Sequence, residues 1–270
     1  MPQNTQEPQD FRLPPTGVES HAHLNGRHFH HDVQQVLERA KAAGISAIGN
    51  VFMGPDELEK GQHLFDTAPE VFFMLGIHPT DSRLCTAEAL ARMAGQLRAN
   101  PRIKGVGETG LDFYWKNCPP DVQHAAFHAH LDLAEESGLP VVIHSRDATE
   151  ATLNVLLARG FSGKPLLWHC FGGTAEDMRR IVDNGWRLSI PGPITYPANQ
   201  ALREAAAAIP LDHLLLETDC PYLAPVPFRG KRNEPAHMVY TAQAIALARG
   251  MSVADLWTAT GDNARNFFNL

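Results

Sequence analysis

Eight short apolar segments alternate along the chain with longer segments of helical spacing, and this alternation limits the possible folds more than any other feature. Strands joined by helices pack as right-handed βαβ units in a parallel sheet. Eight such units favour a closed (β/α)8 barrel of the TIM type, whose usual size of about 250 residues suits a chain of 270. The predicted strands are Gly17–His23, Ile45–Val51, Val71–His78, Ile103–Glu108, Pro140–His144, Pro165–His169, Trp186–Ile190 and His213–Asp219.

Helical spacing fills the connections and the carboxyl-terminal part of the chain. The predicted helices are His31–Ala43, Thr86–Ala99, Asp121–Ser137, Ala148–Arg159, Ala175–Asn184, Ala198–Ile209, Glu234–Arg249 and Val253–Phe268. No linker divides the chain, so we expect one barrel domain over residues 17–270, preceded by a flexible tail over residues 1–16.

Composition narrows the class of protein further. Hydrophobic residues make up 44% of the chain, which excludes a disordered or collagen-like protein. No apolar run approaches the roughly 18 residues of a membrane span, and the amino terminus lacks the apolar stretch of a signal peptide. The four cysteines form no CxxC pattern, which favours a reduced, cytoplasmic protein.

The net charge of −7 excludes the broad basic surface that most sequence-independent nucleic-acid binders carry. An anionic substrate would therefore need a local source of positive charge. The 14 histidines suggest bound cations, because neutral imidazole is the commonest metal ligand.

Six metal-ligating side chains stand at the carboxyl ends of five predicted strands. Catalytic residues of a (β/α)8 barrel collect at this end, which is the mouth of the barrel. Each side chain alone could be a hydrogen-bonded core group, but six together would need partners. The six are His21, His23, Glu108, His144, His169 and Asp219.

A divalent metal would supply those partners. Six ligands exceed the three protein ligands that are usual for one catalytic zinc, so two metal ions fit better. Glu108 stands in the middle of the ligand order and is the natural carboxylate to bridge them. The mixed nitrogen and oxygen ligands suit zinc, manganese, iron or nickel, whereas magnesium prefers oxygen.

Several motifs give the chain a resemblance to the TatD family of metal-dependent deoxyribonucleases, a branch of the amidohydrolase-like barrels. The resemblance extends from Gly17 to Leu270. Two positions depart from it, since Glu19 and Asn25 stand where the family commonly has Asp. The matching segments are Ser20–Leu24 (SHAHL), Gly76–Pro79 (GIHP), Gly107–Asp112 (GETGLD), Val142–Ala148 (VIHSRDA), His169–Gly173 (HCFGG), Glu217–Pro225 (ETDCPYLAP) and Arg229–Pro235 (RGKRNEP).

The resemblance implies how the ligands are shared. One metal would be held by His21, His23, Glu108 and Asp219, and the other by Glu108, His144 and His169. It also implies phosphodiester hydrolysis in DNA, with RNA as a second candidate, by removal of nucleotides from a 3′ end of single strands. Magnesium, manganese and zinc are the ions described for the family, and some relatives have been proposed to deacylate mischarged tRNA.

A mechanism follows from two metals about 3.5–4 Å apart, which can activate a water and stabilise the attacking and leaving oxygens. Asp219 is the expected general base. Four further residues are candidate substrate contacts: His78 and Arg146 for phosphate, Tyr222 for a base, and Arg229 in the compact basic cluster after the eighth strand. Each of these residues also has a structural explanation. His78 and Tyr222 could simply pack their loops, and Arg229 could lie in a solvated loop. Arg146 could pair with Asp112 or Asp147 instead of a phosphate.

Two other classes of protein compete with this interpretation. An amidohydrolase for a small molecule often bridges its metals with a carboxylated lysine, but Lys104 lies about 13 Å deeper along its strand than Glu108. A non-enzymatic nucleic-acid scaffold would not need the ligand set. We therefore expect a metal-dependent hydrolase with no obligate protein partner. Glu217 shares the strand parity of Asp219, which predicts a supporting or interior ion-pair role.

Overall fold

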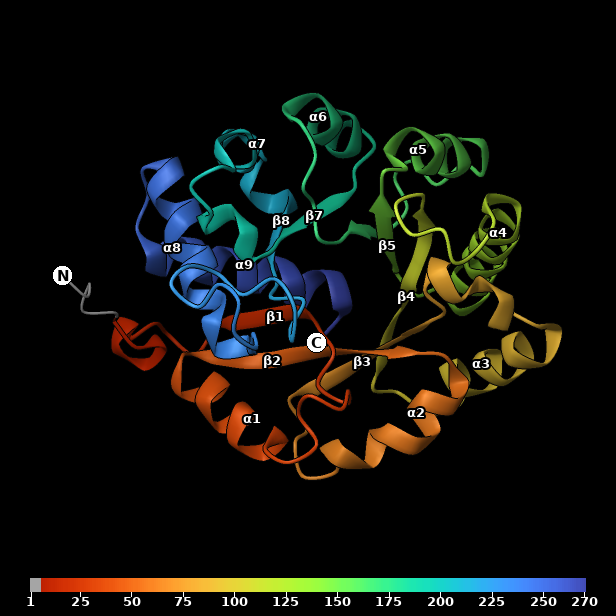
Figure 1. Cartoon of the computed structure of the whole chain (residues 1–270), viewed down its shortest axis with the longest axis horizontal. Coiled ribbons are helices and arrows are strands. Elements are labelled where there is room, and N and C mark those ends of the chain that lie inside the picture. Colours follow the sequence, from red (N-terminus) through yellow and green to blue (C-terminus); the bar gives the residue numbers. More distant parts are fainter. Residues whose placement is uncertain (1–5) are drawn as a thin grey trace.

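The computed structural model describes residues 6–270, in which eight parallel strands form one sheet in the order β1 to β8 (Figure 1). Each strand pairs with the next one along the chain, so the predicted (β/α)8 barrel is confirmed. The strands are β1 (Gly17–Ala22), β2 (Ile45–Met53), β3 (Val71–Gly76), β4 (Ile103–Asp112), β5 (Val141–Arg146), β6 (Leu166–Trp168), β7 (Arg187–Ile190) and β8 (Leu214–Leu216).

The helices form the outer layer around these strands (Figure 1). The α-helices are α1 (Val33–Ala42), α2 (Pro55–Gly61), α3 (Ala87–Ala99), α4 (Pro120–Ser137), α5 (Thr149–Ala158), α6 (Ala175–Asp183), α7 (Gln200–Ala208), α8 (Met238–Arg249) and α9 (Val253–Phe268). Short 3-10 turns are η1 (Pro8–Phe11), η2 (Gln62–Phe65), η3 (Pro79–Leu84), η4 (Gly192–Thr195), η5 (Leu211–His213) and η6 (Pro235–His237).

Among the strands that carry the six metal-ligating side chains, three end two or more residues away from the predicted position. We expected Glu108 to end the fourth strand, but β4 continues to Asp112, and Glu108 lies inside it where the pairing with β5 is irregular. Likewise, β5 continues past His144 to Arg146. We expected Asp219 to end the eighth strand, but β8 stops at Leu216, and Asp219 lies beyond it with a left-handed backbone (φ 54°).

Helix α2 was not predicted. Gly54 and Pro55 interrupt the apolar pattern after the second strand. In the structure Pro55 begins the helix, a position where its fixed φ and missing N–H are tolerated. In residues 6–270 no helix has the length and hydropathy needed to cross a membrane.

Between β8 and β1 the barrel closes with few backbone hydrogen bonds. In residues 6–270 this boundary has one isolated parallel bridge, Ala22 with Cys220. Side chains add to it, because the Ser20 hydroxyl donates to the Leu216 carbonyl at 2.9 Å and the Thr218 amide donates to the Glu19 carboxylate at 2.9 Å.

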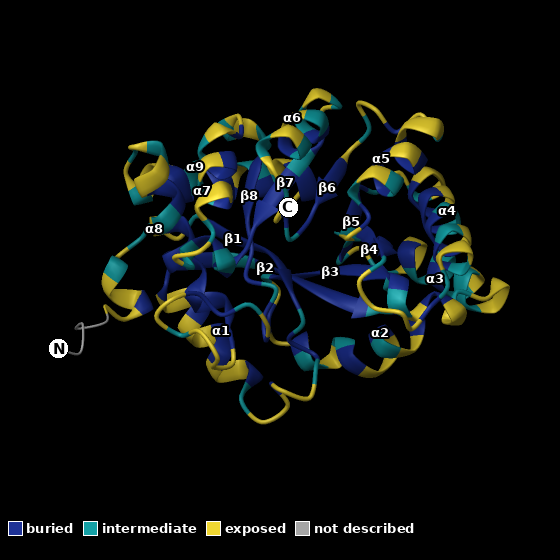
Figure 2. Cartoon of the chain, turned by 45° about the horizontal axis from the view of Figure 1, so that its top comes forward, coloured by how far each residue is buried: buried dark blue, intermediate teal, exposed yellow. Residues whose placement is uncertain are grey.

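The strands are buried, while the outer faces of the helices are exposed (Figure 2). The buried apolar side chains form two clusters. The larger cluster lies between sheet and helices. The smaller one contains Val18, Met74, Val142 and Leu215 together with Phe268 at the end of α9. Because Phe268 packs on Phe72 near the start of β3, the chain's end covers the barrel floor, opposite the mouth.

Part of the predicted tail, residues 1–16, contacts helices α8 and α9. The Tyr240 hydroxyl on α8 donates to the Gln6 carbonyl at 2.6 Å, and the Trp257 indole on α9 donates to the Pro14 carbonyl at 3.0 Å. Phe11 packs edge-on against Tyr240. Residues 1–5 lie outside the described residues, and the domain boundaries stay a prediction.

Candidate metal centre

Glu108 occupies the centre of the barrel mouth, and the local sequence explains how it gets there. Gly107 has a φ of 153°, and a Cβ at that position would lie 2.5 Å from the Val142 carbonyl oxygen. Only glycine allows this close approach of β4 to β5. The approach places the Glu108 carboxylate in the interior, where the side chain is 4% exposed.

One oxygen of Glu108 faces the residues at the boundary between β1 and β8. Its Oε1 lies 3.7 Å from His21 Nε2 and 3.5 Å from His23 Nε2. Asp219 Oδ1 lies 3.3 Å from His23 Nε2 and 4.0 Å from His21 Nε2. The imidazoles of His21 and His23 therefore each face both carboxylates, Glu108 and Asp219, and His21, His23 and Glu108 lie close enough together to hold one ion.

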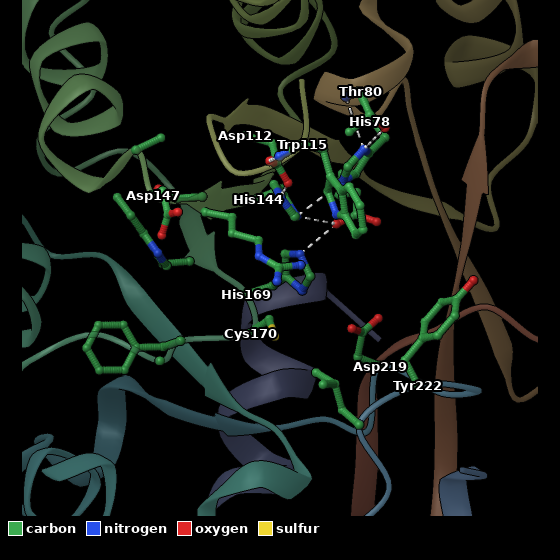
Figure 3. Close-up of a pocket in the computed structure, with 18 of the residues that line it drawn as sticks. His78, Thr80, Asp112, Trp115, His144, Asp147, His169, Cys170, Asp219 and Tyr222 are labelled. Carbon is green, nitrogen blue, oxygen red and sulfur yellow. Dashed lines mark hydrogen bonds and ion pairs between the residues drawn. The ribbon is translucent and has the colours of Figure 1, made fainter. Parts of the chain in front are cut away.

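The other oxygen faces the residues at the ends of β5 and β6. Glu108 Oε2 lies 3.4 Å from His144 Nδ1 and 2.6 Å from His169 Nε2 (Figure 3). The structure thus brings together all six side chains that the sequence singled out, and it divides them into two groups that share Glu108. Lys104 lies elsewhere, with its ammonium 3.4 Å from the carbonyl of Asn269.

Two further carboxylates stand behind the histidines of the second group. Asp112 Oδ2 lies 2.9 Å from His144 Nε2, and Glu217 Oε2 lies 3.7 Å from His169 Nδ1. Glu217 also accepts from the Cys170 amide at 2.6 Å and the Ser189 hydroxyl at 2.5 Å. A carboxylate behind a histidine commonly orients the ring of a metal ligand.

The central imidazoles lack hydrogen bonds of their own. Within residues 6–270, both ring nitrogens of His21 and both of His169 are buried with no hydrogen-bond partner. The two rings stack with centroids 3.9 Å apart and planes at 6°. Because buried polar atoms are nearly always paired, these nitrogens indicate a ligand, and their chemistry fits a divalent metal.

Electrostatics favour ionised carboxylates at the centre. Burial alone would raise the pKa of Glu108, but the charges of His169 and His21 and the close approach of the His144 and His169 imidazoles to the carboxylate hold it well below its usual value. Burial likewise opposes ionisation of Asp219, yet a hydrogen bond from His23 lowers its pKa. The cluster therefore presents two anionic carboxylates to any cation.

The pKa is lowered for one histidine of the cluster and raised for the other three, depending on the charged groups nearby. Burial and the charge of His169 lower the pKa of His21. Burial also opposes protonation of His23, His144 and His169, but neighbouring carboxylates outweigh it and raise the pKa of each, that of His169 well above its usual value through Glu108.

A cavity of about 1340 Å³ opens above the cluster (Figure 3). His78, Arg146 and Tyr222, three of the predicted substrate contacts, line it. His78 Nε2 lies 3.3 Å from His144 Nδ1, and burial lowers the pKa of His78 to about 4. Tyr222 is 57% exposed beside His23.

The two predicted arginine contacts, Arg146 and Arg229, both lie over aromatic rings, but only Arg146 lines the cavity. Arg146 has no ion pair to Asp112 or Asp147 among the described residues, and its guanidinium lies 3.8 Å above the Tyr114 ring. Arg229 does not line the cavity, and its guanidinium lies 4.5 Å above the Tyr196 ring. Arg232 pairs with Asp32 at 2.7 Å, outside the mouth.

Sequence reasoning missed Asp112 as a partner of His144 and missed the exposed Trp115 in the cavity lining. Signals for both were present in the run Asp112-Phe113-Tyr114-Trp115, which begins with the last residue of β4. Phe113 in the same run is half-buried against the apolar core.

A family model for "TatD related DNase" matches residues 18–269. The chain belongs to this family. A Bacillus subtilis protein named uncharacterized metal-dependent hydrolase YabD is 36% identical over 252 residues, which cover 93% of this chain and 98% of that protein. The Erwinia amylovora TatD, named a 3′-5′ ssDNA/RNA exonuclease, is 36% identical over 255 residues, with 92% and 97% covered.

Solved structures agree with the family assignment. The crystal structure of the TatD homologue YJJV from Escherichia coli K12 has a TM-score of 0.89 at 26% identity, covering 94% of this chain and 98% of that one. The chain is thus a TatD-type metal-dependent hydrolase that acts on ester bonds, as the sequence predicted.

Proposed function

We propose that this hydrolase uses two divalent ions to cleave phosphodiester bonds at the 3′ end of single-stranded DNA, with RNA as a second substrate. The observation that carries the proposal is the division of the ligands by Glu108. Its Oε1 faces His21 and His23, and its Oε2 faces His144 and His169. Such an arrangement suits a carboxylate shared between two ions.

His21, His23, Glu108 and Asp219 would hold one ion, and Glu108, His144 and His169 the other. When bound, a pair of divalent ions lowers the pKa of a water and stabilises charge on phosphate oxygens. Zinc, manganese, iron and nickel suit these mixed ligands, and magnesium is the oxygen-preferring alternative.

Asp219 is the proposed general base. Its pKa is lowered, so the carboxylate is ionised at neutral pH and able to accept a proton. Its side chain is 16% exposed to the cavity, against 4% for Glu108, so a water can reach Asp219 more readily. Its backbone is fixed, because the Asp219 amide donates to the His21 carbonyl at 3.0 Å.

The charges of the cavity make cations necessary for a phosphate substrate. Besides the central carboxylates, the lining includes Glu57, Asp81, Asp147, Glu150 and Asp177. Among the lining residues that the structure describes, Arg146 is the one arginine or lysine. Without bound cations, such a cavity would repel a nucleic acid.

His78 is the proposed contact for a phosphate oxygen. Since its pKa is about 4, the ring is neutral at pH 7 and donates a hydrogen bond rather than a charge. Tyr222 and Arg146 are proposed substrate contacts on other parts of the rim, and relatives named as exonucleases for ssDNA and RNA support this substrate class.

The test combines metal analysis with degradation of 3′-labelled single-stranded DNA. The wild type should hold two equivalents and release labelled nucleotides. Glu108→Ala should lose both ions and activity, whereas His169→Ala should keep the first ion. Glu59→Ala, which removes an exposed carboxylate paired with Arg92, is the matched control and should behave as the wild type.

Two results would contradict the proposal. Retention of two equivalents by Glu108→Ala would show that Glu108 does not bridge the ions. Faster turnover of a cyclic amide than of DNA or a p-nitrophenyl phosphodiester would favour an amidohydrolase.

A further inference from the structure

Two aromatic side chains protrude at the rim of the mouth, directly after β4. Tyr114 is 49% exposed and Trp115 is 50% exposed, and their ring centroids lie 5.1 Å apart in an edge-to-face arrangement. Trp115 lines the cavity above the metal cluster, on a different part of the rim from Tyr222 (Figure 3). The remaining tryptophans of residues 6–270 are at most 3% exposed.

Packing of the core does not explain why the Tyr114 and Trp115 rings are exposed. Phe113, the residue before the pair, is the one that packs against the core. Large aromatic faces left half in water lose the stabilisation that burial would give, so a loop that keeps two of them there points to a ligand that covers them.

The pair is fixed relative to the metal cluster by one buried carboxylate. Asp112 Oδ1 accepts from the amides of Tyr114 at 3.0 Å and Trp115 at 2.8 Å. Its Oδ2 lies 2.9 Å from His144 Nε2. Asp112 itself is 1% exposed, so the same rigid group orients a metal ligand and the turn that carries the aromatic rings.

Arg146 completes the arrangement. Its guanidinium lies 3.8 Å above the ring centroid of Tyr114 and 5.8 Å from that of Trp115, and it has no ion pair to a carboxylate within the described residues. A planar cation beside exposed aromatic faces offers both stacking and a bidentate contact to phosphate.

We infer that Tyr114, Trp115 and Arg146 form a subsite that stacks an unpaired nucleobase and contacts its phosphate beside the metal centre. This inference rests on the proposed function and specifies its substrate. A base in a duplex has both faces covered by its neighbours, so the subsite selects single strands or frayed ends. It accepts any base, because every base has a π face.

Binding to the metal-loaded protein tests the subsite without turnover. The probes are a dye-labelled phosphorothioate octathymidylate, the same backbone with abasic sugars, and a blunt duplex. The octathymidylate should bind about tenfold more tightly than the abasic backbone, which is the effect of about one stacked base. It should also quench the emission of the exposed Trp115.

Variants separate stacking from folding. Trp115→Ala should reduce the tenfold preference to less than threefold, and Trp115→Phe should restore part of it. Leu247→Ala, which removes an 83% exposed side chain on α8, is the control and should keep the preference. Equal binding of octathymidylate and abasic backbone by the wild type would overturn the subsite while leaving phosphodiester cleavage standing.

The duplex gives the other decisive result. If the blunt duplex quenches the emission of Trp115 as strongly as the single strand does, the subsite does not select unpaired bases. Failure of every probe to bind would contradict the proposed function together with the subsite.

Discussion

His21 and His130 are both fully buried imidazoles, but their ring nitrogens have opposite surroundings. His130, on α4, has Nδ1 2.7 Å from the Ala126 carbonyl oxygen, and its Nε2 accepts from the Ile77 amide at 2.9 Å. His21, at the end of β1, has no hydrogen bond at either nitrogen and faces Glu108 and Asp219 instead.

The difference separates a structural histidine from a ligand. A buried imidazole whose two nitrogens are satisfied by backbone groups holds two elements together and needs nothing more. A buried imidazole with two unpaired nitrogens beside two carboxylates is stabilised only when something binds it. Residue type alone does not distinguish the two, and the sequence points to His21 only through its place at the carboxyl end of a predicted strand.

The largest expected effect concerns the carboxylate beside His21. Asp219→Asn should lower kcat on 3′-labelled single-stranded DNA by about 10²–10⁴-fold, because the amide cannot accept the proton. The melting temperature of the chelated protein should change little. Unchanged turnover would eliminate Asp219 as the base.

The next effect concerns stability rather than activity. His130→Ala should lower the free energy of unfolding by about 3 kcal/mol, since it leaves a cavity and an unpaired Ile77 amide. Urea unfolding measures the change, and metal content should stay at the wild-type value. A loss of metal without a loss of stability would reverse the roles assigned to His130 and His21.

Metal removal gives a third measurement. At an ion concentration of 100 times Kd, each bound ion should stabilise the wild type by about 2.7 kcal/mol. The same increment should appear in His130→Ala and shrink in His21→Ala. Equal increments in both variants would show that His21 does not contribute to ion binding.

Acid should affect His130 in a known direction. Burial lowers the pKa of its imidazole to about 4, against 6.5 for an exposed ring. On acidification the unfolded chain therefore takes up the proton first, so stability present above pH 6.5 is lost as the pH falls toward 4. By pH 5 the loss is about 2 kcal/mol. With metal removed by chelation, the free energy of unfolding of His130→Gln should depend less on pH than that of the wild type. Identical pH dependence in the two proteins would contradict the low pKa assigned to His130.

The smallest expected effect is a loss of affinity at only one of the two ion positions that share Glu108. Glu217→Gln weakens the carboxylate behind His169 and should reduce affinity for the second ion about tenfold. The first ion should be retained, as titration with a metal indicator would show. Equal weakening at both positions would indicate a general loosening of the barrel.

The sequence predicted the barrel and the convergence of the six side chains because strand alternation and residue type determine both. His144 and His169 follow apolar runs of the sequence and lie at the mouth, as expected. The position of Glu108 inside β4 was not predictable, because it depends on how closely Gly107 approaches Val142.

The directions of side chains in the loops after the strands could not be predicted from the sequence either. Arg229 follows the eighth strand, but the loop carries it over Tyr196 rather than into the cavity. The exposure of Trp115 depends on two hydrogen bonds to Asp112 across a tight turn, and residue type alone favours burial.

The sparse hydrogen bonding between β8 and β1 links metal binding to the integrity of the cylinder. His21 and His23 come from one side of this boundary and Asp219 from the other, so an ion held among them would act as a cross-link between the first and last strands. The chain between those strands is long, since Glu19 and Thr218 are 199 positions apart. Such a bond restrains a large loop, and amide hydrogens along this seam should exchange with solvent faster once the ion is withdrawn.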